Sequence, residues 1–355
     1  MIKVLDKLRV RKENLVLYQA GLPSFPRIVA RDSIISAILL KDVGMMHDTL
    51  LFCIKNQGKK KDAISGEEPG KIHHEVPPWE HLGLNTKYNS CDSTALFLMG
   101  IKEYIRLSRD WGFVSTNNEA ILNAVSYILS HLKGGVFYED PVFCGAKRFA
   151  LGATYWKDSQ LIGRKNAEYP VAYFLAHVQN MAGLRAAAYL LKDGSLLDKA
   201  NEMKEHINDF IDDDVGFILA RDKKGPIKVL SSDSLHALFY LEKGDFTKDF
   251  LKEIVKKCKP LETTIGYRTM EPRKSDLCRD PYHCKTVWPF EQVLINLGAK
   301  RFALRDPVKV SERIMRALTT DSEYFSIDNK GKKFVKSGSD PQLWTIATKK
   351  YFGLN

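Results

Sequence analysis

The sequence predicts an all-α protein in which a set of enclosed helices is surrounded by a set of amphipathic ones. Two kinds of helical segment alternate along the chain. One kind is apolar or small on nearly every side, as in residues 33–40, 94–107 and 171–191. A helix without a polar face has to be covered by other helices, so the alternation predicts two concentric rings.

The second kind of segment carries a single apolar stripe at helical spacing. The clearest stripes are Leu196, Ala200, Met203, Ile207 and Phe210, then Phe246, Phe250, Ile254 and Cys258, then Val310, Ile314 and Leu318. Counting both kinds of segment, we expect about eleven helices. Strand patterns are sparse. Residues 217–220 and 227–230 flank Lys223-Lys224-Gly225, which predicts at most a small β-hairpin.

Length and composition favour one large domain. The chain has 355 residues, of which 44% are hydrophobic, so it can bury a sizeable core. No linker-like or low-complexity stretch divides it, and we expect a single domain over residues 1–355. The first residues lack the apolar region of a secretory signal, and no run approaches the roughly 18 apolar residues that cross a bilayer. We therefore expect a soluble, cytoplasmic protein with no membrane partner.

The net charge of +11 raises the question of a nucleic-acid partner. The lysines are spread along the chain, and only residues 59–61 and 332–333 form local runs. No helix-turn-helix, zinc-finger or ribonucleoprotein signature accompanies them. We therefore expect no nucleic-acid partner and attribute the charge to solubility.

Cysteine spacing and glycine-rich motifs exclude several other classes of function. The six cysteines contain no C-x-x-C pair, and although Cys278, His283 and Cys284 lie close together, we interpret the cysteines as free thiols. Neither a phosphate-binding G-x-x-x-x-G-K-[ST] loop nor a G-x-G-x-x-G or G-x-S-x-G motif occurs. We expect no metal and no cofactor.

Two acidic segments flanked by aromatic residues suggest hydrolysis of a glycosidic bond. Trp156 precedes Asp158 in the middle of the chain, and Glu323 precedes Tyr324 and Phe325 near its end. Such hydrolysis uses one carboxyl group that donates a proton to the leaving oxygen and a second that activates water. Aromatic neighbours stack on sugars and raise the pKa of the acid by desolvation. Taken alone, an acidic residue of this kind ahead of an apolar stretch is more often a plain helix N-cap.

Further segments of the chain match a single family pattern in the same order. They are Ala20-Gly21-Leu22-Pro23-Ser24-Phe25 with Ala30-Arg31-Asp32-Ser33, Glu68-Pro69-Gly70-Lys71-Ile72-His73-His74-Glu75, Tyr88-Asn89-Ser90-Cys91-Asp92-Ser93-Thr94, Trp156-Lys157-Asp158-Ser159, Tyr282-His283 with Val287-Trp288-Pro289, and Glu323-Tyr324-Phe325 with Pro341-Gln342-Leu343-Trp344. The ordered set, from about residue 20 to 345, resembles the glycogen-debranching-type amylo-α-1,6-glucosidases and the glucoamylase-like glycoside hydrolases.

The resemblance implies an (α/α)6 toroid and an inverting hydrolysis that needs no metal. By position, Asp158 would be the general acid and Glu323 the general base. Arg31 and Asp32 would hold hydroxyls of the terminal sugar. The same pocket would be lined by His74, Glu75, Tyr88 and Asp92, with Trp156 and Trp288 as stacking faces and Tyr282 and His283 closing one side. The implied substrate is an α-glucan or a small α-glucoside.

Alternatives remain open at this stage. Arg31 and Asp32 fit an ordinary salt bridge at a helix start, and Trp288 fits a packed helix start. The rival carboxylates are Glu139, Glu271 and Glu291. The linkage is not readable, and a catalytically silent sugar-binding or regulatory toroid is an alternative function. A lyase or epimerase on the same scaffold is disfavoured because both Asp158 and Glu323 are present.

The chain departs from the family pattern in two ways. Ser24 replaces a tryptophan, Ala30 a glycine, and Lys285 the glycine before the Val-Trp-Pro segment. Lys285 is long and charged, and we expect it to bear on the choice of substrate. The longer relatives also carry an N-terminal β-sandwich domain that we do not expect here, so a separate β-domain subunit is a candidate partner. The oligomeric state is not predicted.

Overall fold

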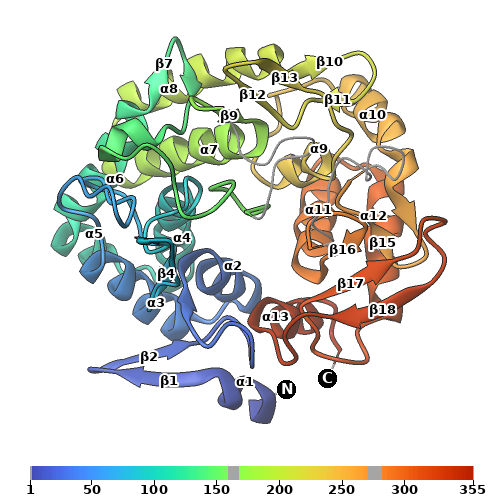
Figure 1. Cartoon of the computed structure of the whole chain (residues 1–355), viewed down its shortest axis with the longest axis horizontal. Coiled ribbons are helices and arrows are strands. Elements are labelled where there is room, and N and C mark those ends of the chain that lie inside the picture. The colour runs from blue at the N-terminus through green and yellow to red at the C-terminus, as the bar shows by residue number, and fades with distance from the viewer. Residues whose placement is uncertain (1, 159–167, 271–281, 355) are drawn as a thin grey trace.

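The computed structural model describes residues 2–158, 168–270 and 282–354, and helices dominate it. Six helices contact one another in cyclic order around a common centre (Figure 1). These inner helices are α2 (Ala30–Leu40), α4 (Ser93–Ser108), α7 (Phe174–Leu191), α9 (Asp233–His236), α11 (Pro289–Arg301) and α13 (Leu343–Tyr351). Contacts between α13 and α2 close the ring and bring the two ends of the chain near each other (Figure 1).

Further helices lie against the outside of this ring. They are α1 (Ile2–Leu8), α3 (Val43–Lys55), α5 (Trp111–Thr116), α6 (Asn118–Ser130), α8 (Gly194–Glu205), α10 (Lys248–Lys257) and α12 (Arg305–Glu312). Helix α3 packs on α2 and α4, α8 on α7, and α12 on α11 (Figure 1). Each inner helix is therefore covered by at least one outer helix.

Burial explains why the two kinds of helix take these places. Along α7 every residue from Phe174 to Ala187 is buried, including the polar His177, Gln179 and Asn180. On α8 only Leu196, Ala200 and Met203 are buried. Burial of apolar surface stabilises the fold by about 25 cal/mol per Å². The all-round apolar segments therefore go inside and the striped ones outside, which confirms the predicted order.

The expectation of at most one β-hairpin is wrong. The predicted hairpin is present, with β12 (Ala220–Asp222) antiparallel to β13 (Gly225–Ile227), and β9 (Ala172–Tyr173) joins it as a third strand. Seven more small sheets occur in the described residues. Most of their strands have two residues, which is too short for a period-two pattern to be visible in the sequence.

Two of these additional sheets position parts of the site described below. Strand β3 (Ile28–Val29), which leads into α2, pairs with β4 (Glu75–Val76). Strand β17 (Tyr324–Ile327) pairs with β16 (Thr286–Val287) and with β18 (Phe334–Ser337). The remaining sheets are β1 (Arg9–Lys12) with β2 (Leu15–Tyr18), β5 (Glu80–His81) with β6 (Leu84–Asn85), β7 (Leu132–Lys133) with β8 (Val136–Phe137), β10 (Ile211–Asp212) with β11 (Gly216–Phe217), and β14 (Glu262–Thr263) with β15 (Gly266–Tyr267).

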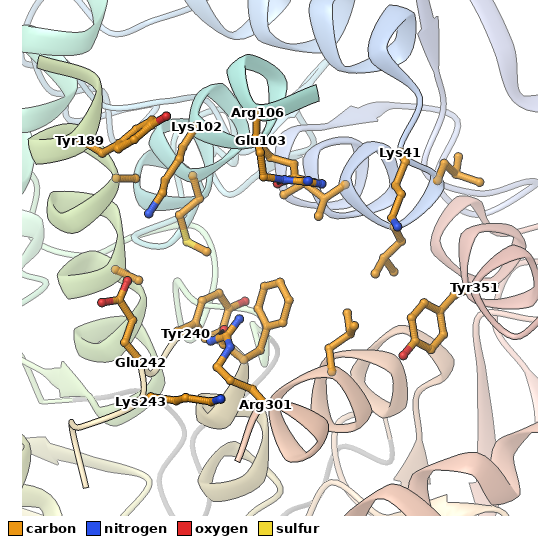
Figure 2. Close-up of a pocket in the computed structure, with 18 of the residues that line it drawn as sticks. Lys41, Lys102, Glu103, Arg106, Tyr189, Tyr240, Glu242, Lys243, Arg301 and Tyr351 are labelled. Atoms are coloured by element: carbon orange, nitrogen blue, oxygen red, sulfur yellow. Dashed lines mark hydrogen bonds and ion pairs between the residues drawn. The ribbon is translucent and has the colours of Figure 1, made fainter. Parts of the chain in front are cut away.

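The two ends of the ring differ. The first turns of α2 and α13 and the segment before α11 line a cavity of about 70 Å³, which we call the narrow cavity. The last turns of α2, α11 and α13 and the second halves of α4 and α7 line a cavity of about 990 Å³, which we call the wide cavity (Figure 2). On α2 the lining residues of the two cavities that lie nearest each other are Asp32 and Ile38, which are about 9 Å apart along the helix axis.

None of the helices in the described part of the chain is both long enough and apolar enough to span a bilayer.

The close packing of the inner ring generates a first prediction. A Cβ atom on Gly298 of α11 would lie 2.5 Å from the carbonyl carbon of Leu238, so Gly298→Ala forces backbone to move. We expect this overpacking to lower the free energy of unfolding by about 1–3 kcal/mol in urea denaturation. The control is Gly194→Ala at the start of α8, where nothing lies within 4 Å of the added atom. A Gly298→Ala protein as stable as this control would contradict the packing described.

Candidate functional site

The narrow cavity collects most of the residues that the sequence singled out. Its lining consists of Ala20, Phe25, Val29, Arg31, Asp32, His74, Glu75, Trp156, Asp158, Tyr282, His283, Trp288, Glu323, Gln342 and Trp344. These residues come from segments far apart in the chain. The ring brings them together because each segment immediately precedes or opens an inner helix, or lies in a loop at the same end.

Arg31 is the central cation of the narrow cavity. It is 2% exposed, and its Nε and Nη2 atoms donate to both carboxylate oxygens of Asp92 at 3.0 and 3.1 Å. Its Nη1 lies 3.5 Å from Oδ2 of Asp158. Burial alone would lower the pKa of Arg31, but the carboxylates of Asp92, Asp158 and Asp32 outweigh it and raise that pKa. Arg31 therefore stays charged and links α2, the N-cap of α4 and the segment that carries Asp158.

Asp158 has the environment of a carboxylic acid that keeps its proton near neutral pH. Desolvation raises its pKa to about 7, the guanidinium of Arg31 opposes the shift, and the charges of Glu75 and Asp92 add to it. His74 Nε2 lies 3.7 Å from Asp158 Oδ2, and burial lowers the pKa of His74 to about 4, so this imidazole is neutral. The Asp158 side chain is 23% exposed and can therefore reach a ligand.

Glu323 has a different environment. Its Oε1 accepts a hydrogen bond from the hydroxyl of Tyr282, and its Oε2 accepts one from the backbone N–H of Ser339 at 2.9 Å. Burial raises its pKa, while both hydrogen bonds favour the charged form and oppose the shift. Gly338 makes this fit possible, because a Cβ atom there would lie 2.4 Å from Glu323 Oε2.

A third carboxyl group, that of Asp32, lies beside these two. Burial raises its pKa well above the usual range, Arg31 opposes the shift, and the charges of Glu323 and Asp158 add to it. Gln342 donates from Nε2 to Asp32 Oδ2 at 3.4 Å. The narrow cavity thus offers one fixed cation and several oxygen acceptors, a set that suits hydroxyl groups.

Aromatic side chains form a continuous wall of the narrow cavity. The ring of Trp288 is stacked on His283 at 5.3 Å and meets the ring of Tyr282 edge-on at 5.0 Å. Trp156 packs edge-on against Trp288 at 6.0 Å. Burial, with Lys157 and Arg31 nearby, lowers the pKa of His283 well below its usual value, so the wall carries no charge there.

Asp233, the first residue of α9, holds the segment that precedes Asp158. It accepts from Tyr155 Oη at 3.2 Å, from Trp156 Nε1 at 2.9 Å and from Lys157 Nζ at 2.8 Å. Lys157 also donates to Ser231, Ser232 and the carbonyl of Thr269. Three consecutive side chains are therefore anchored by one buried carboxylate, which limits where Asp158 can lie.

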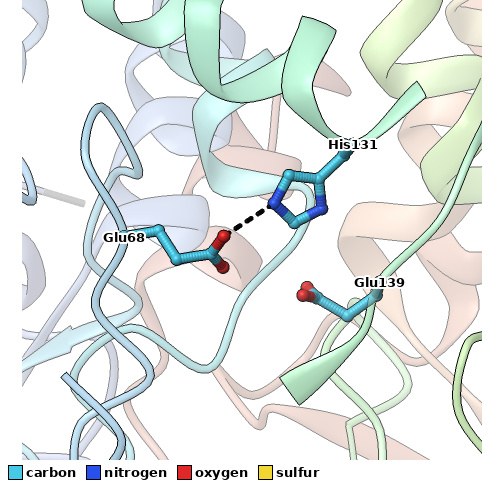
Figure 3. A group of neighbouring side chains, drawn as sticks. All are labelled: Glu68, His131 and Glu139. Atoms are coloured by element: carbon cyan, nitrogen blue, oxygen red, sulfur yellow. Dashed lines mark hydrogen bonds and ion pairs between the residues drawn. The ribbon is translucent and has the colours of Figure 1, made fainter. Parts of the chain in front are cut away.

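A second buried cluster braces the loop that carries His74 and Glu75. Figure 3 shows Glu68, His131 and Glu139, whose ligand-type atoms lie within 4.8 Å of one another. Such a group could hold a metal ion, but Lys71 Nζ lies 3.1 Å from Glu68 Oε1 and 3.6 Å from Glu139 Oε1. The lysine supplies the cation that these carboxylates need. Asp233, His236 and Glu291 form a similar group, in which Lys157 Nζ lies 2.8 Å from Asp233 Oδ1.

Several predicted or rival residues lie outside the lining of the narrow cavity. Asp92 lies behind Arg31, and the hydroxyl of Tyr88 donates to the carbonyl of Asn56 at 2.9 Å. Glu139 belongs to the cluster with Lys71, and Glu291 accepts from Ser232 at 2.6 Å. Glu271 lies outside the described residues.

Lys285 also lies outside the lining of the narrow cavity. Its φ of 59° is in the left-handed region, which explains why a glycine suits this position. The free-thiol interpretation is wrong for Cys284, which is disulfide-bonded. It holds for Cys53, Cys91, Cys144 and Cys258.

Phe25, Gln342 and Trp344 belong to the matched motifs, but the sequence predicted no role for them. All three line the narrow cavity. Gln342 Oε1 and Trp344 Nε1 are buried and have no hydrogen-bond partner among the described residues, so they are available to a ligand. The available signal was their place in the matched motifs, Phe25 in the first and Gln342 and Trp344 in the last.

Comparison with known proteins identifies the fold. No family model matches the chain, and no curated protein matches its sequence. Solved structures of the GH63 mannosylglycerate hydrolase from Thermus thermophilus match it. The complex with Tris has a TM-score of 0.71 at 12% identity, covering 99% of this chain and 98% of that one. The complex with glucose matches with a TM-score of 0.70 at 12% identity and the complex with Tris and D-glycerate with 0.71 at 11%, over the same shares of the two chains. The two proteins share a fold.

The anchoring of residues 155–157 generates a stability prediction. Asp233→Asn leaves the ammonium of Lys157 buried without its counter-charge, which typically costs about 3–5 kcal/mol. We expect a loss of that size in the free energy of unfolding measured in urea. The matched control is Asp249→Asn on α10, where the carboxylate is 89% exposed and we expect a change within about 0.5 kcal/mol. Equal losses in the two variants would show that Asp233 does not anchor the segment.

Proposed function

We propose that this protein is an inverting glycoside hydrolase that acts on an α-glycosidic bond, with Asp158 as the general acid and Glu323 as the general base. One observation carries the proposal. Both carboxyl groups line the narrow cavity and burial raises both pKa values, that of Asp158 to about 7, while hydrogen bonds from Tyr282 and from the Ser339 N–H favour the charged form of Glu323. Divergent environments of two carboxyl groups mark an acid and a base.

The proposed reaction proceeds in one displacement. Asp158 donates its proton to the glycosidic oxygen as the bond to the anomeric carbon breaks, and Glu323 removes a proton from the attacking water. The bound water adds to the opposite face of the sugar, so the configuration is inverted. Arg31 lies 3.5 Å from Asp158 and stabilises the aspartate formed after proton transfer. No metal and no cofactor are required.

The roles of the other lining residues follow from their chemistry. We propose that Arg31, Asp32, His74 and Glu75 hold sugar hydroxyls, and that the sugar ring lies on the aromatic wall. The aromatic wall consists of Trp156, Tyr282, His283 and Trp288. The proposed architecture is a single (α/α)6 toroid over residues 1–355. The proposed location is the cytoplasm, with neither nucleic acid nor membrane as partner.

The substrate that the narrow cavity favours is small. Its volume of about 70 Å³ is below the roughly 150 Å³ of a cavity that admits benzene, so the lining has to open for a sugar ring. The structural neighbour was solved with glucose and with D-glycerate, so sugar and acid parts are bound on that fold. We propose that the substrate is a small α-glucoside. The non-reducing end of an α-1,4 or α-1,6 glucan is the second choice.

A substrate panel tests the proposal. The panel contains glucosylglycerate, mannosylglycerate, trehalose, maltose, isomaltose, panose and glycogen, and free sugar is measured. For the best substrate, Asp158→Asn and Glu323→Gln should each lower kcat by roughly 10²–10⁴-fold, as loss of a general acid or base does. The control pair is Asp249→Asn and Glu253→Gln on the exposed face of α10. Retention of activity in either site variant would remove that residue from the mechanism.

The alternative function is a catalytically silent sugar-binding toroid that works with another subunit. It predicts that the protein binds a glucose-like inhibitor but releases no sugar from any member of the panel.

The protonation states generate a pH prediction. Activity needs Asp158 protonated, so it falls as pH rises through about 7, and it needs Glu323 ionised, so it falls as pH drops through a pKa raised above 4.5. We expect a bell-shaped profile of kcat/KM with its alkaline limb near pH 7. The charge of Glu75 helps to raise the pKa of Asp158, so Glu75→Gln should move the alkaline limb to lower pH. An alkaline limb that does not move in this variant would contradict the assignment of Asp158 as the acid.

A further inference from the structure

The wide cavity lies at the end of the ring opposite the narrow cavity and takes no part in the proposed hydrolysis. Its volume is about 990 Å³, at the upper end of the usual range for ligand sites. Apolar side chains form its inner surface, among them Leu39, Met99 and Leu297. Leu39 is buried, while Met99 and Leu297 are half-buried, so the surface between the helices is available for contact.

Basic side chains from separate elements surround this apolar surface. They are Lys41, Lys102, Arg106, Lys243, Arg301 and Lys350, against the acidic Glu103 and Glu242. Figure 2 shows Lys41, Lys102, Arg106, Lys243 and Arg301 around one open space. A concave surface lined by charges of one sign concentrates the electrostatic potential and attracts counter-ions.

The partners of these side chains show which charges are free for a ligand. Arg106 is paired with Glu103 through two contacts of 2.7 Å, and Arg301 donates to the carbonyls of Phe239 and Leu241. By contrast, Lys41, Lys243 and Lys350 make no ion pair with any residue that the structure describes. Lys102 also makes no ion pair with a described residue, and its Nζ lies 5.5 Å from the centre of the Tyr189 ring. Four lysines of the lining therefore make no ion pair with a described residue, and Glu242 is an acidic group of the same lining that also makes none.

Ring faces accompany the ammonium groups. Tyr189 is 47% exposed, and Phe239 and Tyr351 are half-buried at the same cavity. Several unpaired lysines suit a ligand with more than one negative charge, since a single carboxylate would use only one of them. Aromatic faces suit a flat or ring-shaped organic part. Phosphate esters of ring compounds combine both properties.

We propose that the wide cavity is a binding site for an organic phosphate with a ring-shaped part, either a nucleotide or a phosphorylated sugar. The phosphate groups bind between Lys102 and Lys243, and the ring lies against Tyr189. The same lysines can also stabilise the protein without binding a ligand, and the experiment has to distinguish the two roles. The carboxyl ends of inner helices meet here, and cations near helix carboxyl ends stabilise the helix dipole without any ligand.

Calorimetric titration of the full chain at low salt tests the proposal, with ADP, glucose 6-phosphate and inorganic pyrophosphate as probes. We expect saturable binding of ADP or glucose 6-phosphate with a Kd below about 1 mM, and weaker binding of pyrophosphate because it lacks a ring. Which of the two esters binds more tightly identifies the source of the phosphate. The readout does not depend on hydrolysis, so it stands or falls apart from the proposed enzyme activity.

Matched variants locate the binding. Lys102→Gln with Lys243→Gln should weaken binding of the preferred ester at least about tenfold, because two charge-assisted contacts are lost. Lys199→Gln with Lys252→Gln removes the same charge from exposed sites on α8 and α10 and should leave the Kd within about twofold. Circular dichroism verifies that both proteins are folded.

Three results would overturn the proposal. The first is the absence of saturable binding, with the cavity variant merely less stable, which would leave the helix-dipole role. The second is equal weakening in the two double variants, which would indicate non-specific attraction to a basic surface. The third is pyrophosphate binding as tightly as both esters, which would exclude a ring-shaped ligand.

Discussion

The buried pairing of Arg31 with Asp92 and Asp158 is the contact on which the narrow cavity depends. A guanidinium withdrawn from water is costly unless carboxylates compensate it, and here it meets one of them in a two-point contact. Because Arg31 opens α2 and Asp92 precedes α4, the pair joins adjacent helices of the inner ring. The same cation is close enough to Asp158 to moderate its pKa. One residue therefore links the packing of the ring to the proton affinity of the site.

The ring architecture explains why so many polar groups tolerate burial at one end. The segments that open the inner helices meet there, and each brings side chains whose partners come from another helix. Asp233 of α9 holds residues 155–157 through three direct hydrogen bonds, and Lys71 neutralises Glu68 and Glu139 behind the loop with His74. These buried contacts restrict the positions of Asp158 and His74. Restricted positions are what general acid–base chemistry requires, since a donor and an acceptor must stay within hydrogen-bond reach of the reacting atoms.

The sequence predicted the helical order well because burial follows composition. The segment 171–191 has no polar face, and α7 is accordingly enclosed, whereas the stripe of Leu196, Ala200 and Met203 marks an outer helix. Most of the site residues named from the motifs line the narrow cavity, but Tyr88 and Asp92 do not. Residues that act through others were not predicted. Asp233 lies in no matched motif, and Lys71 lies in one but was given no role. Only the folded ring shows that the carboxylate of Asp233 faces residues 155–157. Short strands such as β3 and β4 arise from loop contacts that leave no periodic pattern.

A direct measurement of the Asp158 pKa tests the central claim that this carboxyl group is held as an acid. Carbon NMR of protein labelled at aspartate carboxyl carbons, titrated with pH, resolves the group, and the signal missing from Asp158→Asn assigns it. The account predicts a midpoint near pH 7, because burial outweighs the opposing charge of Arg31. A midpoint near 4, the ordinary value for an exposed aspartate, would contradict the role of Asp158 as proton donor and with it the proposed mechanism.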